Sequence, residues 1–220
     1  MKPLKEYEQK RRFTKTSEPP PKKKNSLSGN LFVIQKHRAS HLHYDFRLEM
    51  NGVLKSWAVP KGPSLDPSVR RLAMVVEDHP LDYAGFEGII PEGEYGGGTV
   101  MIWDRGTYIP DNDMTTGLLK GELKFTLDGS KLQGSWVLVR TKDRQWLLIK
   151  HRDQHASTDD ITVSSPRSVV TRRTLAEIAK DEGGNVAKAA TGDPLVLPPL
   201  VGRKNRPKRK SSDYPARSMT

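Results

Sequence analysis

Cysteine is absent from this chain of 220 residues. A disulfide framework and a thiolate metal site are therefore excluded, and a bound metal ion must take nitrogen or oxygen ligands. The sequence also lacks any run of the ~20 apolar residues that a membrane span needs, and Met1–Pro20 has no apolar stretch typical of a secretory signal. We therefore expect a cytoplasmic protein with no membrane partner.

Basic charge is abundant but concentrated at the two ends. The formal net charge is +11, with nine Lys and Arg against three Glu in residues 1–30 and seven against one Asp in residues 201–220. Residues 31–200 are nearly neutral, with 21 basic and 22 acidic side chains. Basic segments that neutralise phosphates release counterions, so these ends favour a polyanionic partner. Tails that only keep the chain soluble are the alternative interpretation.

The chain divides into three parts. Residues 1–30 are expected to form a basic flexible arm, residues 31–182 a β-rich domain ending in a short helix, and residues 183–220 a basic linker or tail. Alternating or β-branched patterns predict eight strands: Val33–Lys36, Leu42–Met50, Val53–Val59, Leu72–Val76, Thr99–Trp103, Glu122–Leu127, Ser135–Arg140 and Trp146–Lys150. Seven or eight short strands at close spacing favour an all-β fold, a small closed or partly open barrel with disordered basic tails.

Local signals support this division. Asn51-Gly52 lies between two alternating segments and predicts a tight hairpin, because both central residues of such a turn take positive φ. Leu175–Lys180 is the expected helix, with Thr174 as its cap and Glu177 completing a capping box. The tryptophans of the apolar strands are expected in the core: Trp103, Trp136 and Trp146.

Chemistry-bearing residues alternate along the segment Leu42–Met50. Its even positions are apolar, whereas its odd positions are His43, Asp45, Arg47 and Glu49. Side chains two residues apart lie on the same face of a strand, ~6.5–7 Å apart at the backbone, so His43 and Asp45 can both reach one cation. The alternative is an ordinary strand with a solvated charged face.

His37 can supply a third metal ligand, because it lies just before the turn expected over Arg38–His41. Two histidines and one carboxylate suit Mn²⁺, Fe²⁺ or Zn²⁺. Arg47, further along the same face, would direct a bidentate guanidinium at an anion on the metal, as a phosphate requires. His41 is interpreted as an exposed neighbour of the site.

A second polar cluster, Glu77-Asp78-His79, lies directly before Pro80. His79 can act there as a general acid or as a donor to a phosphoryl oxygen, and a solvated turn is the alternative. Lys61 and Arg71 are further cationic candidates, although each alone is also typical of a surface charge. Residues 93–98 are glycine-rich but lack the Gly-Lys-Ser/Thr ending of a P-loop, so they predict a plain loop or bulge.

Seven segments within residues 30–152 share, in the same order, the pattern of a known family. They are Phe32–His37, His43–Glu49, Leu54–Pro63, Val76–Tyr83, Phe86–Gly88, Ile90–Gly93 and Trp103–Gly106. In these segments the chain resembles the 3′-phosphoesterase domain of bacterial DNA ligase D. The ligase and polymerase modules of that protein do not fit in 220 residues, so the resemblance implies a free-standing relative or an excised piece.

The resemblance implies a metal-dependent hydrolase with a Mn²⁺-preferring site. It would remove a 3′-terminal ribonucleotide or a 3′-phosphate and leave a 3′-hydroxyl during double-strand break repair by non-homologous end joining. By position, His37, His43 and Asp45 resemble the metal ligands, and Arg47 and His79 resemble the groups that contact the scissile phosphate. The resemblance implies a supporting shell as well: Lys61, Arg71, Glu77, Asp78 and Tyr83. The implied partners are DNA primer-template 3′ ends, a DNA ligase and Ku, near the nucleoid.

Two other classes of protein remain open at this point. His43-x-Asp45 also begins the facial triad of non-haem iron oxygenases, for which His151 followed by Arg152 is the late candidate. A non-catalytic nucleic-acid-binding module is the other alternative, supported by the basic ends.

Overall fold

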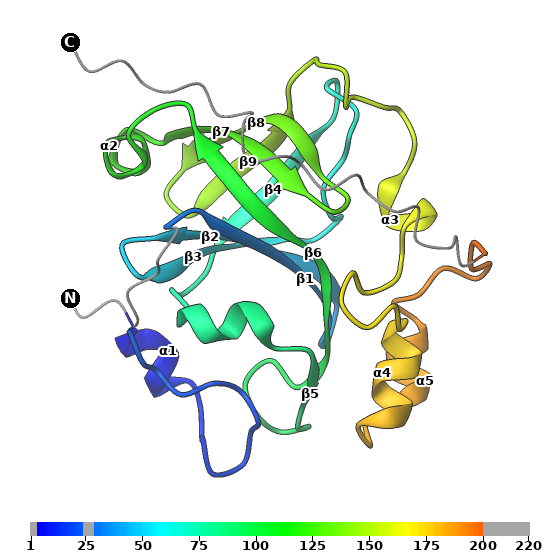
Figure 1. Cartoon of the computed structure of the whole chain (residues 1–220). Coiled ribbons are helices and arrows are strands. Elements are labelled where there is room, and N and C mark those ends of the chain that lie inside the picture. Colours follow the sequence, from blue (N-terminus) through cyan, green and yellow to red (C-terminus); the bar gives the residue numbers. More distant parts are fainter. Residues whose placement is uncertain (1–3, 24–28, 200–220) are drawn as a thin grey trace, which may run out of the picture.

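Eight antiparallel strands form a closed barrel at the centre of the computed structural model, which describes residues 4–23 and 29–199 (Figure 1). Around the barrel the strands follow the order β1-β2-β3-β4-β9-β8-β7-β6, and β6 pairs back with β1. Their bounds are β1 (Leu31–Arg38), β2 (Leu42–Met50), β3 (Val53–Val59), β4 (Arg70–Val75), β6 (Gly98–Pro110), β7 (Glu122–Gly129), β8 (Gln133–Lys142) and β9 (Gln145–Lys150). The predicted small β-barrel is confirmed, and of the closed and partly open forms that the sequence allows, the structure has the closed one.

Each predicted strand overlaps one barrel strand, although two details differ. β6 runs on to Pro110, well beyond the predicted Thr99–Trp103, and a three-residue strand β5 (Gly88–Ile90) pairs with its outer edge. Asn51 and Gly52 have φ values of 54° and 80°, so the predicted hairpin between β2 and β3 is confirmed. Such a short segment as β5 gives no periodic signal in the sequence.

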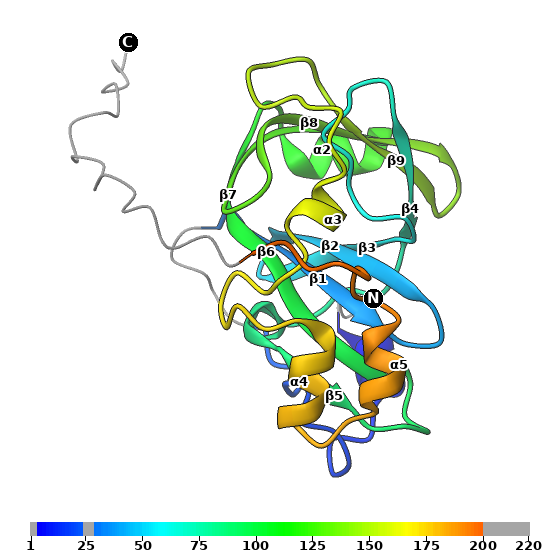
Figure 2. The same ribbon diagram turned by 90° about the vertical axis from the view of Figure 1, so that its right-hand side faces the viewer.

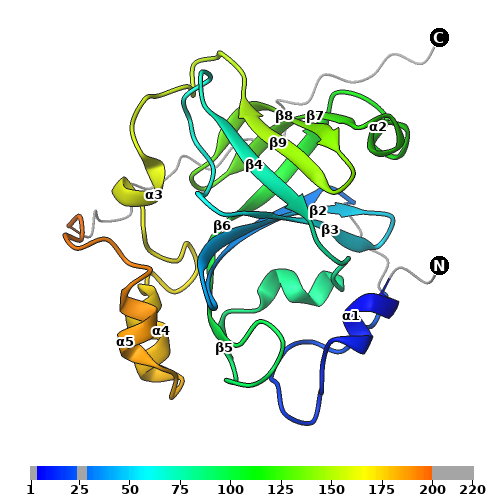
Figure 3. The same cartoon turned by 180° about the vertical axis from the view of Figure 1, so that it is seen from behind.

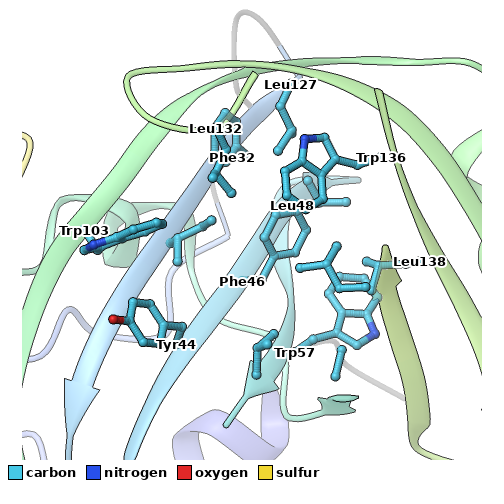
Figure 4. Close-up of a cluster of buried hydrophobic side chains, with 14 of the residues drawn as sticks. Phe32, Tyr44, Phe46, Leu48, Trp57, Trp103, Leu127, Leu132, Trp136 and Leu138 are labelled. Carbon is cyan, nitrogen blue, oxygen red and sulfur yellow. The ribbon is translucent and has the colours of Figure 1, made fainter. Parts of the chain in front are cut away.

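The barrel interior is a core of aromatic and aliphatic side chains (Figure 4). Phe46 and Leu48 of β2 are fully buried in it, together with Trp57 of β3. Trp103, Trp136 and Trp146 are also buried, as predicted. The even-numbered residues of β2 thus point inward, and the odd-numbered residues with the polar side chains point outward.

A second apolar layer covers the outside of the wall formed by β1, β2 and β3. Two short helices lie against this wall, α1 (Lys5–Gln9) and the 3₁₀ helix η1 (Leu81–Gly85) (Figures 1 and 3). Tyr7 and Tyr83 of these helices pack with Val33 of β1 and Leu54 of β3. The outer face of the wall is therefore buried.

The N-terminal segment is not the free arm that its charge suggested. Tyr7 has no exposed surface, and its hydroxyl donates to the carbonyl of Pro19 at 2.6 Å. Arg11 and Lys10 form ion pairs with Glu77 of the barrel domain, each at 3.0 Å. Residues 4–23 pack on the barrel because their bases meet acids there and because Tyr7 is buried and Phe13 partly buried in the second apolar layer.

The C-terminal segment also differs from the linker expected from residue 183. Figure 2 shows α4 (Leu175–Asp181) and α5 (Val186–Ala190) side by side against the barrel. Asp193, beyond α5, accepts hydrogen bonds from the first backbone amides of α4 at 3.1 and 2.9 Å and lies 3.8 Å from Lys36 of β1. The chain is therefore folded well past residue 183, and the predicted basic tail at 200–220 lies outside the described residues.

Helices are more numerous than predicted. The capping box of Thr174 and Glu177 on α4 is confirmed, but α1, α2 (Met114–Lys120), α3 (Ile161–Ser164) and α5 had no prediction. At four to seven residues they are too short for a clear helical period. Within residues 4–23 and 29–199, none of the helices has the length and apolar character needed to cross a membrane.

Candidate metal and phosphate site

Strand register brings the predicted site residues together on the outer face of the barrel wall. His37 of β1 is directly opposite His43 of β2, and Gln35 is opposite Asp45. On the other side of β2, Arg47 is opposite Ser56 of β3. Three adjacent strands therefore present one continuous polar surface.

Three of these side chains converge. Ligand atoms of His37, His43 and Asp45 all lie within 4.8 Å of one another. His37 Nδ1 is 3.9 Å from Asp45 Oδ2, and His43 Nε2 is 3.7 Å from Asp45 Oδ1. The convergence predicted for these residues is thus present.

Backbone carbonyls orient both imidazoles. His37 Nε2 lies 2.8 Å from the carbonyl oxygen of Gly96, and His43 Nδ1 lies 3.1 Å from that of His41. A carbonyl oxygen only accepts, so each of these nitrogens carries the hydrogen and donates. The lone pairs of the other two nitrogens are then directed at Asp45. Metal-ligating histidines commonly have this outer hydrogen bond.

The charges of the cluster suit a divalent cation. Burial lowers the pKa of His37 to about 4, and the neighbouring His43 acts in the same direction. Burial opposes ionisation of Asp45, but the charge of Arg47 and the two histidines outweighs it, so the pKa of Asp45 is below its usual value. A neutral imidazole and an ionised carboxylate are the forms that bind metal ions. The residues present therefore fit a divalent transition metal.

Arg47 lies beside the cluster and is 2% exposed. Its guanidinium donates to Asp45 Oδ2 at 3.0 Å, to Gln35 Oε1 at 2.8 Å and to Ser56 Oγ at 2.8 Å. The amide of Gln35 in turn donates to the carbonyl oxygen of Tyr83, at 3.0 Å. These bonds hold the guanidinium in a single orientation, next to the metal cluster.

His79 lies between two guanidinium groups. Its Nδ1 is 2.8 Å from the carbonyl oxygen of Glu77 and 2.9 Å from Arg47 Nη1, and its Nε2 is 3.2 Å from Arg11 Nη2. Because a carbonyl oxygen only accepts, Nδ1 carries the hydrogen that goes to Glu77, and Nε2 accepts from Arg11. Arg47 Nη1 is then a close neighbour of Nδ1 and not its hydrogen-bond partner. Burial, followed by the charges of Arg47 and Arg11, holds the pKa of His79 well below its usual value. His79 is therefore neutral near pH 7.

Arg11 is the main residue that sequence reasoning missed. It donates to Glu18 at 2.9 Å and to Glu77 at 3.0 Å, and its guanidinium lies 3.9 Å from the ring centroid of Tyr7. Glu18 also accepts from the Tyr83 hydroxyl at 2.8 Å. The sequence signal was weak, because Tyr7 and Phe13 are the only aromatic residues in residues 1–30, where lysine and arginine are abundant.

A cavity of about 290 Å³ joins these groups. The metal cluster lines it together with Arg47, His79 and Arg11. Tyr83 and Glu77 line the same cavity, so the structure brings both together with the cluster. Burial raises the pKa of Tyr83 well above its usual value, with Glu18 acting in the same direction, so its hydroxyl stays protonated.

Three candidates from the sequence do not line the cavity: Lys61, Arg71 and Asp78. Asp78 instead pairs with Lys55 of β3 at 2.6 Å. Lys61 is exposed after the end of β3, and Arg71 lies on β4 opposite Leu148. Residues 93–97 form the expected loop, and the carbonyl oxygen of Gly96 in this loop orients His37.

His151 does not join the metal cluster, as the oxygenase alternative would require. Its Nδ1 lies 2.9 Å from Ser135 Oγ, just after β9. Among the described residues, one group of three side chains could hold a metal ion, and its third member beside His43 and Asp45 is His37.

The fold and this site define a small all-β barrel domain whose outer wall combines a two-histidine, one-carboxylate cluster with buried guanidinium groups. Residues 35–140 match the family described as the DNA ligase D 3′-phosphoesterase domain. The chain belongs to this family.

Relatives with the same domain are named as multifunctional non-homologous end joining proteins LigD. The protein from Pseudomonas aeruginosa is 56% identical over 183 residues, covering 79% of this chain and 22% of the relative. The protein from Mycobacterium tuberculosis is 48% identical over 155 residues, covering 69% of this chain and 20% of the relative. The one from Mycolicibacterium smegmatis is 43% identical, with 67% and 20% covered. The chain thus spans about a fifth of the length of these relatives.

Proposed function

We propose that this chain is a Mn²⁺-dependent phosphoesterase that processes DNA 3′ ends. It removes a 3′-terminal ribonucleotide and a 3′-phosphate and leaves a 3′-hydroxyl, as a step in double-strand break repair by non-homologous end joining. The family and the names of the relatives support this reaction and this setting. The geometry that carries the proposal is one cavity lined by both a candidate metal cluster and two guanidinium groups.

His37, His43 and Asp45 would hold the metal ion, each through an atom that already points at the other two residues. When bound, the ion supplies a Lewis acid that polarises a phosphoryl oxygen. The family resemblance favours Mn²⁺, and the mixed nitrogen and oxygen ligands are compatible with it.

Arg47 and Arg11 would bind the remaining phosphoryl oxygens. Charge-assisted hydrogen bonds from guanidinium groups suit these oxygens, and the low exposure of both side chains strengthens the attraction. Removal of one preorganised donor of this kind typically lowers the rate ~10²–10³-fold.

His79 receives a role different from general acid. Its imidazole is neutral, donates to Glu77 and accepts from Arg11. A neutral imidazole has no extra proton to give to a departing oxygen. We assign it to the positioning of the two guanidinium groups, with Glu77 and Tyr83 supporting the same arrangement. Lys61, Arg71 and Asp78 would act at longer range, on DNA or on the rim of the site.

A gel assay tests the proposed function. A 5′-labelled primer-template ending in one ribonucleotide is incubated with wild-type protein with and without Mn²⁺. We expect shortening to a 3′-hydroxyl product only with the metal ion, loss of this product in His43→Ala, and wild-type rates in Leu119→Ala, an exposed control on α2. Normal turnover by metal-loaded His43→Ala would refute its assignment as a ligand.

The same assay separates the two alternatives. A non-catalytic nucleic-acid module predicts DNA binding that survives chelation and no product under any condition. An oxygenase predicts succinate formation from 2-oxoglutarate with Fe²⁺.

Protein partners are a separate part of the proposal. The resemblance suggests that a DNA ligase and Ku act with this domain on the same break near the nucleoid. Co-purification of the tagged chain with either protein, with and without DNA, tests this.

A further inference from the structure

Tyr95 stands at the mouth of the proposed active site. It is 52% exposed, and it lines the same cavity as the metal cluster and His79. Among the large hydrophobic side chains that are exposed in residues 4–23 and 29–199, it is the single aromatic one. The proposed function assigns no role to Tyr95.

The loop that carries Tyr95 is held against the site. The next residue, Gly96, contributes the carbonyl that accepts from His37 Nε2. The preceding residue, Glu94, accepts two hydrogen bonds from the guanidinium of Arg12, at 2.9 and 2.6 Å. Backbone bonds from Glu94 to Pro91 and from Gly97 to Glu94 close two turns within the loop. The position of the ring is therefore tied to a metal-ligand histidine.

Positive charge surrounds the ring. The Lys10 ammonium lies 4.8 Å from its centroid and 3.4 Å from its hydroxyl, and the Arg11 guanidinium lies 5.9 Å from the centroid. Exposed aromatic rings bordered by cations are the surfaces on which single-stranded nucleic acids bind, because bases stack on the ring while the cations attract the backbone.

We propose that Tyr95 is a stacking platform for a nucleobase adjacent to the scissile phosphate. This inference rests on the proposed function, because it assumes that a nucleic-acid 3′ end enters the cavity. With a phosphate at the metal cluster, the neighbouring nucleoside extends toward the cavity mouth, where Tyr95 lies. Every base has an aromatic face, so the platform accepts all four bases.

Equilibrium binding in EDTA tests the platform independently of catalysis. The full chain and its Tyr95→Leu and Tyr95→Phe variants are titrated against a labelled primer-template ending in one ribonucleotide. We expect Tyr95→Leu to bind about tenfold more weakly, the effect typical of losing one stacked base, and Tyr95→Phe to bind within about twofold of wild type. Leu119→Ala on α2, far from β5 in Figure 1, serves as the control.

Two abasic probes identify the base. One lacks the terminal base and the other lacks the penultimate base. We expect the difference between wild type and Tyr95→Leu to vanish for one of them, which places the stacked base on that side of the phosphate. An undiminished difference on both probes would overturn the proposal, because Tyr95 would then act through Lys10 or the loop. Equal binding of wild type and Tyr95→Leu to the intact probe would overturn it as well.

Turnover with Mn²⁺ separates this inference from the proposed function. Wild-type protein that releases no product contradicts the proposed function, whatever the binding data show. If wild type is active, we expect Tyr95→Leu to raise KM about tenfold on the intact substrate with a smaller change in kcat. An unchanged KM in an active enzyme contradicts the stacking role alone.

Discussion

Replacement of Arg47 by alanine should destabilise the metal-free protein far more than replacement of His43. If the outer strand face were solvated, as the sequence allows, both substitutions would leave folding intact. The structure covers that face instead, so that Arg47 is 2% exposed, whereas 23% of the His43 side chain remains open. The two substitutions therefore differ in the partners they leave buried.

The magnitude follows from those partners. Arg47→Ala leaves Asp45, which is 7% exposed, without its guanidinium, and removal of one member of a buried ion pair costs about 3–5 kcal/mol. Gln35 and Ser56 each lose a further hydrogen-bond donor. His43→Ala removes one hydrogen bond to a carbonyl, a loss of about 1 kcal/mol. We expect a difference of at least about 3 kcal/mol between the variants, a large share of the 5–15 kcal/mol typical of a domain.

Urea unfolding in EDTA, followed by tryptophan fluorescence, measures both values. The double variant Asp45→Ala/Arg47→Ala provides an internal control. Its loss of unfolding free energy should be smaller than the sum of the losses of Asp45→Ala and Arg47→Ala measured separately. An Arg47→Ala protein within about 1 kcal/mol of wild type would show that the guanidinium network does not stabilise the fold, and additive losses would show that the pair is not coupled.

Three further results are expected. Acidification of the metal-free protein from pH 7 to about pH 4 should lower the free energy of unfolding by up to about 3 kcal/mol. The reason is that the His37 pKa of about 4 in the folded protein lies below the value of about 6.5 in the unfolded chain, so the unfolded chain binds the proton first. Urea midpoints that do not change across this pH range would contradict this prediction. Saturating Mn²⁺ should raise the Tm of wild type but not of His43→Ala in a thermal-shift assay, and an equal rise would exclude His43 as a ligand. Asp193→Ala should lower the Tm by several degrees, because the first two backbone amides of α4 lose their acceptor and Lys36 loses a buried partner. An unchanged Tm would mean that the C-terminal segment does not stabilise the barrel.

The barrel and the metal cluster were predictable because their signals are local. Alternation along Leu42–Met50 assigns each side chain to a face, and Asn51-Gly52 specifies the hairpin that sets the register with β3. A short turn likewise places His37 opposite His43. Period and turn type are properties of a few consecutive residues, so they can be obtained from one sequence.

The N-terminal segment covers the outer face of β1, β2 and β3, and this covering was not predictable in the same way. Lys10 and Arg11 pair with Glu77, more than sixty positions away along the chain. The sequence pattern of the N-terminal segment is the same whether its basic residues are solvated or pair with acids of the barrel domain. The difference depends on Glu77, which is distant in the sequence. Tyr7 and Phe13, which pack 5.8 Å apart, were the only local indication of an anchored segment.

Docking of the N-terminal segment determines the electrostatics of the whole site. Arg11 and Arg47 lie on either side of neutral His79, and two guanidinium groups so close would repel each other in a buried cavity. Glu18 and Glu77 compensate Arg11, and Asp45 compensates Arg47. Under the proposed function, a phosphate that enters the cavity would exchange carboxylate oxygens for phosphoryl oxygens around donors that are already oriented. Glu77, which the sequence suggests for a supporting shell, and Glu18, which it does not, would thus keep the Arg11 guanidinium in place until a substrate binds.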